Sequence, residues 1–379
     1  MFNNPFNSLK EFVYLEDNGK ILSMVGLLRS KQRFGNIEVE VGEIALVGTH
    51  PDYRKRGLCF KLMNYWEQFM KENNITLCFL FGIPNFYQQF GFEYAVPVHF
   101  YNYVTIDKEM LKNAMGKYKV EELEAENEDY IIQIKRLYDE GSKMNFCSRV
   151  RSLEYLKHGI EHSSFGAHRW YIVKEDNIVK GYMWLTNSEK EVTIREAVVL
   201  NEEAALSLCE FLYSLAKDKE GIKIIGMKAA LNNSFARFLY KKGGKISCNN
   251  EIYPGSWAGM YKIVDLMAAM NILRESFEER LKESKFCNIN GRYRIVTDIG
   301  AVGLSMNKSK VEICDEVSDA VDIKIPLNIL TSVYTGYRDI AYYKEELSFD
   351  REEDFQVFNV LFPLGSPYIW DLEMSDELE

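Results

Sequence analysis

The stretch of sequence that decides the fold covers residues 41–58 and reads Val41-Gly42-Glu43-Ile44-Ala45-Leu46-Val47-Gly48-Thr49-His50-Pro51-Asp52-Tyr53-Arg54-Lys55-Arg56-Gly57-Leu58. Its apolar first part is typical of a buried strand, and Pro51-Asp52 indicates a turn. After the turn, apolar residues recur at helical spacing, at Leu58, Leu62, Trp66 and Phe69. The stretch therefore predicts a strand, a turn and a helix in succession.

Three cations stand directly before the expected helix, because Arg54, Lys55 and Arg56 precede Gly57. A helix start offers N–H groups without partners and the positive end of the helix dipole, and a glycine lets a ligand approach the backbone. The pattern indicates an anion-binding site, most simply for phosphate. A solvated basic turn before an ordinary surface helix is the alternative. The glycine patterns of nucleotide P-loops and of dinucleotide sites are both missing here.

Residues 54–59, which we call the phosphate loop, resemble a motif of the GNAT superfamily of acyl-CoA N-acetyltransferases. The family motif reads Arg/Gln-x-x-Gly-x-Gly/Ala after a strand, and Cys59 stands where the family has glycine or alanine. A second segment makes the sequence similar to the enhanced intracellular survival (Eis) type of acetyltransferase. It reads Phe79-Leu80-Phe81-Gly82-Ile83-Pro84-Asn85-Phe86-Tyr87-Gln88-Gln89-Phe90-Gly91-Phe92.

The resemblance implies that acetyl-CoA is the co-substrate. The residues expected to bind it are Val47, Gly48, Thr49, Arg54, Lys55, Arg56, Gly57, Leu58, Cys59 and Asn85.

Tyr87 is the expected general acid. It begins the pattern Tyr-x-x-x-Gly-Phe, and in the family the tyrosine of this pattern lies near the acetyl-CoA sulfur, where it can protonate the departing thiolate. A phenol with a pKa of about 10 is a suitable donor to a thiolate where it is partly shielded from water. Packing among the neighbouring phenylalanines is the alternative role for this ring.

Glu43 is the first candidate for the general base. Alternation along the strand puts Glu43, Ala45, Val47 and Thr49 on one face. Glu43 precedes Gly57 by fourteen residues, as the glutamate base does in histone-type members of the superfamily. A solvated edge-strand glutamate is the alternative. Eis-type proteins are thought to use the terminal carboxylate instead, which belongs here to Glu379.

Composition limits the other function classes. The 379 residues are enough for two or three domains, and we find neither an apolar run of about 18 residues nor a basic-then-apolar leader, so a cytoplasmic protein without membrane association is expected. The net charge of -10 argues against nucleic-acid binding. It is compatible with a cationic partner.

Cysteines and histidines give no sign of a metal or of disulfides. The seven cysteines are scattered without a Cys-x-x-Cys pair, and the five histidines show no His-Glu-x-x-His spacing. We therefore expect reduced cysteines and no metal cofactor.

The resemblance implies an α/β (α+β) fold with tandem GNAT domains and a C-terminal domain. Residues 1–100 form the acetyl-CoA-binding GNAT domain, without the first strand and helices that the family carries ahead of the hairpin at residues 12–28. Residues 101–258 repeat the pattern as a degenerate copy. Residues 259–379 resemble a sterol-carrier-protein-like domain.

The degenerate copy keeps the superfamily's late-helix pattern Asn-x-x-Ala-x-x-x-Tyr, at Asn233, Ala236 and Tyr240. Where its phosphate loop should lie there is no glycine, and Glu202 and Glu203 would repel a pyrophosphate. We expect this copy not to bind CoA.

The predicted function is acetyl transfer from acetyl-CoA to a primary amine of a small molecule, aminoglycoside-like or polyamine-like by resemblance. Two other classes stay open. One is a CoA-sensing or assembly protein without turnover, and the other is a lipid-binding protein that acts through the C-terminal domain. Family members form trimers or hexamers, so a homo-oligomer is expected.

Overall fold

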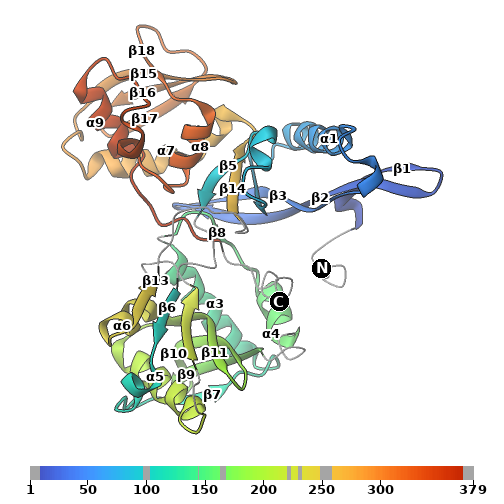
Figure 1. Ribbon diagram of the computed structural model, residues 1–379. Helices are drawn as coiled ribbons and strands as arrows, with labels where there is room; N and C mark the ends of the chain where they lie inside the picture. Colours follow the sequence, from blue (N-terminus) through green and yellow to red (C-terminus); the bar gives the residue numbers. More distant parts are fainter. Residues whose placement is uncertain are drawn as a thin grey trace. The chain divides into compact units, whose positions relative to one another are not determined.

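The computed structural model describes residues 9–96, 103–143, 145–162, 168–219, 223–228, 233–247 and 258–369. The chain divides into two units (Figure 1). The described part of the first comprises residues 9–96, 145–149 and 258–369, and that of the second comprises residues 103–143, 150–162, 168–219, 223–228 and 233–247.

The first sheet starts with the predicted hairpin, formed by β1 (Phe12–Asp17) and β2 (Lys20–Phe34). Asn18 and Gly19 both have positive φ, 50° and 77°. A two-residue turn with this backbone matches the twist of the flanking strands. β2 then pairs with β3 (Ile37–Thr49), so the local turn chemistry builds the first three strands.

Helix α1 (Leu58–Glu72) covers one face of this sheet and confirms the helical spacing predicted after Gly57. Leu62 and Trp66 are buried, and Trp66 Nε1 donates a hydrogen bond of 3.0 Å to the Val25 carbonyl. A Cβ on Gly42 would lie 3.2 Å from the Met70 sulfur. Gly42 therefore allows the helix to pack closely on the strand.

The first sheet has the order β1-β2-β3-β4-β14-β5, with β4 at Leu77–Gly82 and β5 at Glu93–Val96. β14 (Ala258–Ile263) pairs with β4 on one side and β5 on the other. The domain boundary predicted at residue 258 therefore does not separate the first sheet from the last third of the chain. A short apolar run cannot reveal a partner more than 150 residues away, because its alternation fits any sheet.

Beyond residue 263, the first unit contains further helices and strands. They are α7 (Leu266–Lys282), β15 (Asn290–Thr297), β16 (Gly300–Asn307), β17 (Lys310–Cys314), β18 (Val321–Lys324), α8 (Leu327–Tyr334), η6 (Ile340–Tyr343) and α9 (Glu352–Leu361). The sheet has the order β17-β16-β15-β18. Its apolar face and the three α-helices share one core, which includes Leu273, Ile295, Leu330 and Phe358.

The second unit repeats the element order of the first sheet. A hairpin of β9 (His168–Glu175) and β10 (Ile178–Asn187) is followed by β11 (Glu191–Val199), α5 (Glu202–Ala216) and β12 (Lys223–Lys228). β11 and β12 are parallel, as β3 and β4 are. The expected mixed α/β class with GNAT-type sheets is confirmed.

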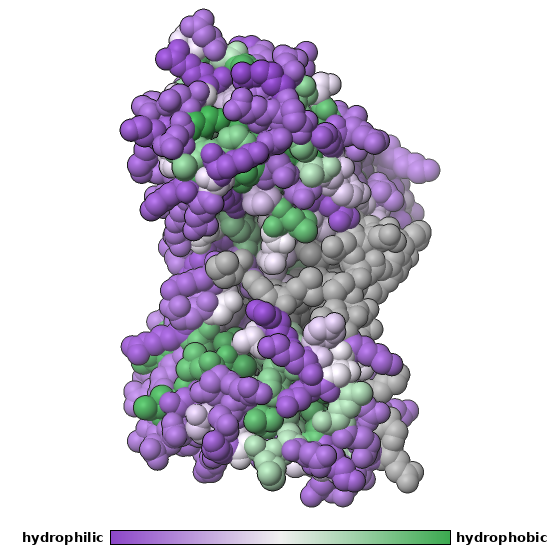
Figure 2. Space-filling view, turned by 90° about the vertical axis from the view of Figure 1, so that its left-hand side faces the viewer, coloured by the Kyte–Doolittle hydropathy of each residue, from purple (hydrophilic) through white to green (hydrophobic). Residues whose placement is uncertain are grey.

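The remaining described elements are divided between the two units. They are η1 (Leu9–Glu11), η2 (Pro51–Tyr53), η3 (Tyr87–Phe90), β6 (Tyr103–Ile106), α2 (Lys108–Leu111), β7 (Lys119–Glu122), α3 (Glu128–Ser142), β8 (Ser148–Arg149), α4 (Leu153–His162), α6 (Ser234–Lys241) and β13 (Lys245–Ser247). The face shown in Figure 2 is mainly hydrophilic, with apolar residues in small groups. Of the helices described, none has the length and apolar character needed to cross a membrane.

Candidate functional site

The site begins where two parallel strands of the first sheet separate. β3 and β4 pair at three positions, the last of which joins Glu43 to Phe79. Beyond this pair β3 continues to Thr49 and β4 to Gly82, and no ladder pair joins these described segments to each other. We call this separation of the two strand ends beyond Glu43 the opening.

A β-bulge redirects the β3 side of the opening. Gly26 pairs with Ala45 and Met24 with Gly48, so β3 contains one extra residue there. Leu46 has a φ of 48°, which is rare for a residue with a Cβ. The prediction that residues 43, 45, 47 and 49 share one face is wrong beyond Ala45, because a bulge shifts the alternation by one residue.

Thr49 is fixed at the end of β3 by hydrogen bonds to β2. Its hydroxyl lies 2.9 Å from that of Ser23, and Ser23 Oγ donates 3.0 Å to the Gly48 carbonyl. These bonds hold the strand end that leads into the phosphate loop.

The phosphate loop is folded by its own cations, which bind carbonyl oxygens. Arg54 Nε donates a hydrogen bond of 3.3 Å to the Thr49 carbonyl. Arg56 donates one of 3.2 Å to the Asp52 carbonyl and stacks on Tyr53. Lys55, whose φ is 60°, makes no such bond to the described residues. Because no carboxylate pairs with these three exposed cations in the described structure, their charge remains available to an anion.

Helix α1 starts without a side-chain cap. Its N-cap residue is Gly57, with a φ of 73°. Nothing lies within 4 Å of a Cβ placed on Gly57, so it is the backbone conformation that favours glycine there. A glycine offers no oxygen to the N–H groups of the first turn. These groups and the helix dipole thus face the same space as the loop cations.

Tyr87 lies across the opening, in η3, and its ring packs on the end of β4. A Cβ on Gly82 would lie 2.3 Å from Tyr87 Cε2, so only glycine fits under this ring. The tyrosine is 8% exposed. Burial, with a smaller contribution from the neighbouring Cys59, raises the Tyr87 pKa to about 12, so the phenol stays protonated at neutral pH. Tyr87 therefore stands beside the first turn of α1.

Replacement of Gly82 by alanine should destabilise the first unit, because the new methyl group must displace the Tyr87 ring. Overpacking of this kind costs about 1–3 kcal/mol. Urea denaturation would measure the free energy of unfolding. Gly48→Ala is the matched control, since its Cβ would meet only Met24 Cγ, at 3.9 Å. Equal stabilities of the two variants would contradict the proposed close packing.

Asn85 holds the chain between β4 and η3. Its φ is 62°, its N–H donates 3.0 Å to the Tyr94 hydroxyl, and that hydroxyl donates 3.1 Å to the Asn85 side-chain oxygen. The Asn85 side-chain oxygen thus accepts a hydrogen bond within the protein, and its amide NH₂ group is the part that could donate to a ligand.

Glu43 shares a face of the sheet with a row of apolar and aromatic residues. Ladder pairs connect Leu28, Glu43, Phe79 and Tyr261 across four strands. This face is opposite to the one that Gly42 presents to α1. Burial first, and the Glu43 carboxylate among smaller causes, raise the Tyr261 pKa above its ordinary value.

The two candidate catalytic groups stand at different positions along the opening and on opposite faces of the sheet. Glu43 pairs with Phe79, whereas Tyr87 packs on Gly82, three residues further along β4. Three residues of strand span roughly 10 Å. A substrate between the two groups would meet Glu43 on one side and Tyr87 on the other. Glu379, the other candidate base, lies outside the described residues.

Lys262, which the sequence analysis missed, supports η3 and joins it to α1. Its Nζ donates a hydrogen bond of 2.8 Å to the Phe90 carbonyl and one of 2.5 Å to the Glu67 carboxylate of α1. Burial opposes ionisation of Glu67, but the ion pairs with Lys262 and Lys71 dominate and lower its pKa. Lys262 comes from β14, so no local pattern could have connected it to Tyr87.

The corresponding helix start in the second unit is capped. Asn201 Oδ1 accepts 2.9 Å from the Ala204 N–H, and Glu202 and Glu203 occupy the first turn of α5. Glu203 forms an ion pair with Lys117 at 3.4 Å. In contrast to α1, the first turn of α5 therefore has an N–H group that is already hydrogen-bonded to Asn201, and it carries two carboxylates.

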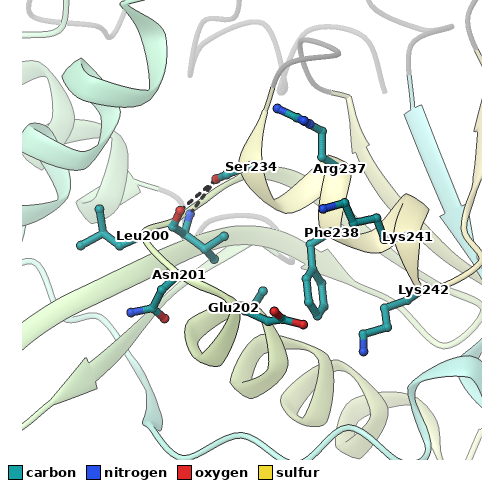
Figure 3. A pocket seen from close by; sticks show the side chains of 10 residues that line it. Leu200, Asn201, Glu202, Ser234, Arg237, Phe238, Lys241 and Lys242 are labelled. Atoms are coloured by element: carbon teal, nitrogen blue, oxygen red, sulfur yellow. Dashed lines mark hydrogen bonds between the residues drawn. The ribbon is translucent and has the colours of Figure 1, made fainter.

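A pocket of about 440 Å³ lies beside this capped helix start (Figure 3). Its cations come from α6 and the residue that follows it, namely Arg237, Lys241 and Lys242. Glu202 lines the same pocket. The second unit therefore has positive charge near this position, but it comes from a helix face and not from a glycine-containing loop.

Comparison with known proteins agrees with this geometry. Residues 2–95 match the family model described as an acetyltransferase (GNAT) domain. No curated protein sequence matches the chain significantly.

Solved structures resemble the chain over nearly its whole length. A GCN5-related N-acetyltransferase from Anabaena variabilis has a TM-score of 0.74 at 17% identity, over 96% of this chain and 89% of its own. A GCN5-related N-acetyltransferase from Kribbella flavida has a TM-score of 0.71 at 14% identity, over 95% of this chain and 86% of its own. Eis1 from Mycobacterium abscessus has a TM-score of 0.65 at 14% identity, over 97% of this chain and 92% of its own. The chain thus has the fold of these proteins, and its residues 2–95 match the model of a GNAT acetyltransferase domain.

Proposed function

We propose that the protein transfers an acetyl group from acetyl-CoA to a primary amine of a small molecule, in one direct step. The observation that carries this proposal is the uncapped start of α1. There, N–H groups and three cations without carboxylate partners in the described structure lie beside a protonated tyrosine. A pyrophosphate needs the first of these features, and a departing thiolate needs the second.

Acetyl-CoA binds along the β3 side of the opening. Its pyrophosphate lies against residues 54–59, and its pantetheine and thioester lie against Val47, Gly48 and Thr49. The bulge in β3 leaves one residue out of the ladder, so backbone N–H groups are available to the thioester carbonyl. Donors fixed in this way stabilise the negative charge that develops on the carbonyl oxygen.

The chemistry follows from the two candidate catalytic groups at the opening. The neutral amine attacks the thioester carbon, the new C–N bond forms, and the C–S bond then breaks. Tyr87 gives its phenolic proton to the CoA sulfur. Glu43 takes the proton that the amine nitrogen loses, directly or through one water, and solvent reprotonates Tyr87. Positioning of the two reactants supplies several kcal/mol, so modest acid and base assistance is sufficient.

Cationic acceptors of the aminoglycoside or polyamine class fit the net charge of -10. An acidic protein raises the local concentration of a polycation by steering.

Acetyl-CoA binding and turnover separate this proposal from its alternatives. Calorimetry with acetyl-CoA should show binding, and a screen of primary amines for release of the CoA thiol should then find an acceptor. Binding without turnover would favour a CoA sensor or assembly protein. If acetyl-CoA did not bind, both the transferase and the CoA-sensor readings would be overturned, and a lipid-binding protein would be favoured.

Lys55→Gln should weaken acetyl-CoA binding up to about tenfold at low salt, and less at high salt. An exposed charge near a phosphate is worth about 1 kcal/mol, and salt screens it. Lys55 is the informative residue because, unlike Arg54 and Arg56, it donates no hydrogen bond that folds the described loop. Lys282→Gln, at the exposed end of α7, is the control. A salt-independent effect, or equal effects of both variants, would argue against a pyrophosphate at the loop.

The other parts of the chain have supporting roles in this proposal. The second unit is a GNAT-like copy that does not bind CoA, which agrees with its capped helix start. The part beyond β14 is a sterol-carrier-like domain with a packed core, and the protein is a homo-oligomer in the cytoplasm. Analytical ultracentrifugation would test the oligomer, and a monomer would contradict it.

A further inference from the structure

Near its C-terminal end, helix α4 carries three side chains of types that can bind metals. His158, Glu161 and His162 occupy positions i, i+3 and i+4, which are neighbours on a helix surface. One ligand atom from each residue lies within 4.8 Å of the other two. The two imidazole rings have centroids 3.9 Å apart. The sequence analysis missed this group because it looked for His-Glu-x-x-His, whereas the order here is His-x-x-Glu-His.

The tautomer of His162 is fixed by the helix. Its Nδ1 lies 2.9 Å from the His158 carbonyl oxygen. A carbonyl oxygen only accepts hydrogen bonds, so Nδ1 carries the hydrogen, and in the neutral ring the lone pair that can bind a metal is on Nε2. Metal-bound histidines commonly use their second nitrogen in this way, which holds the ring in its binding orientation.

The helix that presents these donors is firmly anchored. Tyr155, Leu156 and Ile160 are buried in the second unit. Just before the helix, the buried Arg151 guanidinium donates two hydrogen bonds, of 2.8 and 2.9 Å, to Glu196. Donors on a rigid element lose little conformational entropy when they bind a ligand.

The electrostatics of this helix end favour a cation. The last carbonyls of a helix have no partners within the helix, and its C-terminal end carries the negative end of the dipole. Two imidazoles and one carboxylate suit zinc, copper or nickel better than magnesium or calcium, which prefer oxygen ligands alone.

We propose that His158, Glu161 and His162 bind a transition-metal dication, with zinc as the first choice. Nε2 of His162, one ring nitrogen of His158 and one carboxylate oxygen of Glu161 are the protein ligands, and water completes the coordination. The same order of residues occurs in zinc hydrolases, where the glutamate is a general base. Here Glu161 is exposed and serves as a ligand. In this assignment the bound metal clamps the last turn of α4.

Zinc titration of the full-length chain tests this site. The protein is stripped with a chelator, kept reduced, and titrated with zinc chloride in a calorimeter. The His158→Gln/His162→Gln double variant should lose one zinc per chain or raise its Kd at least about tenfold, and Glu161→Gln should raise it less. Glu154→Gln, in the first turn of the same helix, is the matched control and should bind as the unaltered chain does.

Two results would overturn the proposal. They are the absence of zinc binding by the unaltered chain, and equal stoichiometry and Kd in the double variant. Should that variant unfold, as circular dichroism would show, His162→Gln alone decides, because His162 is exposed. A cobalt-loaded chain adds a spectroscopic check. A thiolate-to-cobalt band that persists in His162→Gln would assign the metal to cysteines and exclude this site. None of these measurements depends on transferase activity.

Discussion

Replacement of Tyr87 by phenylalanine should lower the turnover number about 10²- to 10⁴-fold and leave the Kd for acetyl-CoA within about twofold. The phenol supplies the proton that the CoA thiolate needs, and burial keeps that proton in place by raising the Tyr87 pKa to about 12. Phenylalanine keeps the ring that packs on Gly82 but cannot donate. Steady-state kinetics and calorimetry with acetyl-CoA measure the two quantities.

The fold should tolerate this change. The Tyr87 hydroxyl makes no hydrogen bond to the described part of the chain, so its loss leaves no buried partner unsatisfied there. Tyr65→Phe is the matched control, because Tyr65 lies on α1 in the same unit and is 52% exposed. If Tyr87→Phe turned over as fast as the control, Tyr87 would be a packing residue, and water would have to protonate the thiolate.

The pH dependence of Tyr87 has a definite sign. A tyrosine whose folded-state pKa is raised contributes stability that is fully present below the unfolded value of about 10 and is lost as the pH rises through about 12. The donor therefore stays protonated throughout the neutral and mildly alkaline range. Loss of activity in that range would have to come from another group.

Replacement of Glu43 by glutamine should lower kcat/KM about 10²-fold at neutral pH. An amine acceptor is mostly protonated there, and only its neutral form attacks the thioester. The defect should shrink as the pH approaches the pKa of the acceptor amine, because solvent then removes the proton without help. A pH profile of kcat/KM for the unaltered chain and the variant would show this convergence.

Two comparisons separate Glu43 from its alternatives. Glu40→Gln is the control on the same strand, since Glu40 pairs with Arg29 at 3.5 Å and both side chains are about half exposed. Glu379→Gln, combined with a one-residue extension that moves the terminal carboxylate, tests the other candidate base. A defect in that variant, with Glu43→Gln unaffected, would transfer the role of base from Glu43 to the chain terminus.

The first half of the candidate site could be predicted from the sequence, because its signals are local. Asn18 and Gly19 adopt the positive φ values of a two-residue hairpin turn, and Gly57 adopts the φ that a residue with a Cβ avoids. The order strand, turn, helix follows from a change of apolar period. Each of these features depends on residues that are neighbours in the chain, so composition and spacing are enough to find them.

Only the tertiary structure decided how these pieces form one site. The bulge at Leu46 ends the alternation assumed for β3, and β14 enters the sheet from far along the chain. Through β14, Lys262 reaches the Phe90 carbonyl, and the close contact of Tyr87 with Gly82 needs the fold to bring them together. Strand pairing and side-chain packing are set by contacts between distant residues, and no local pattern contains them.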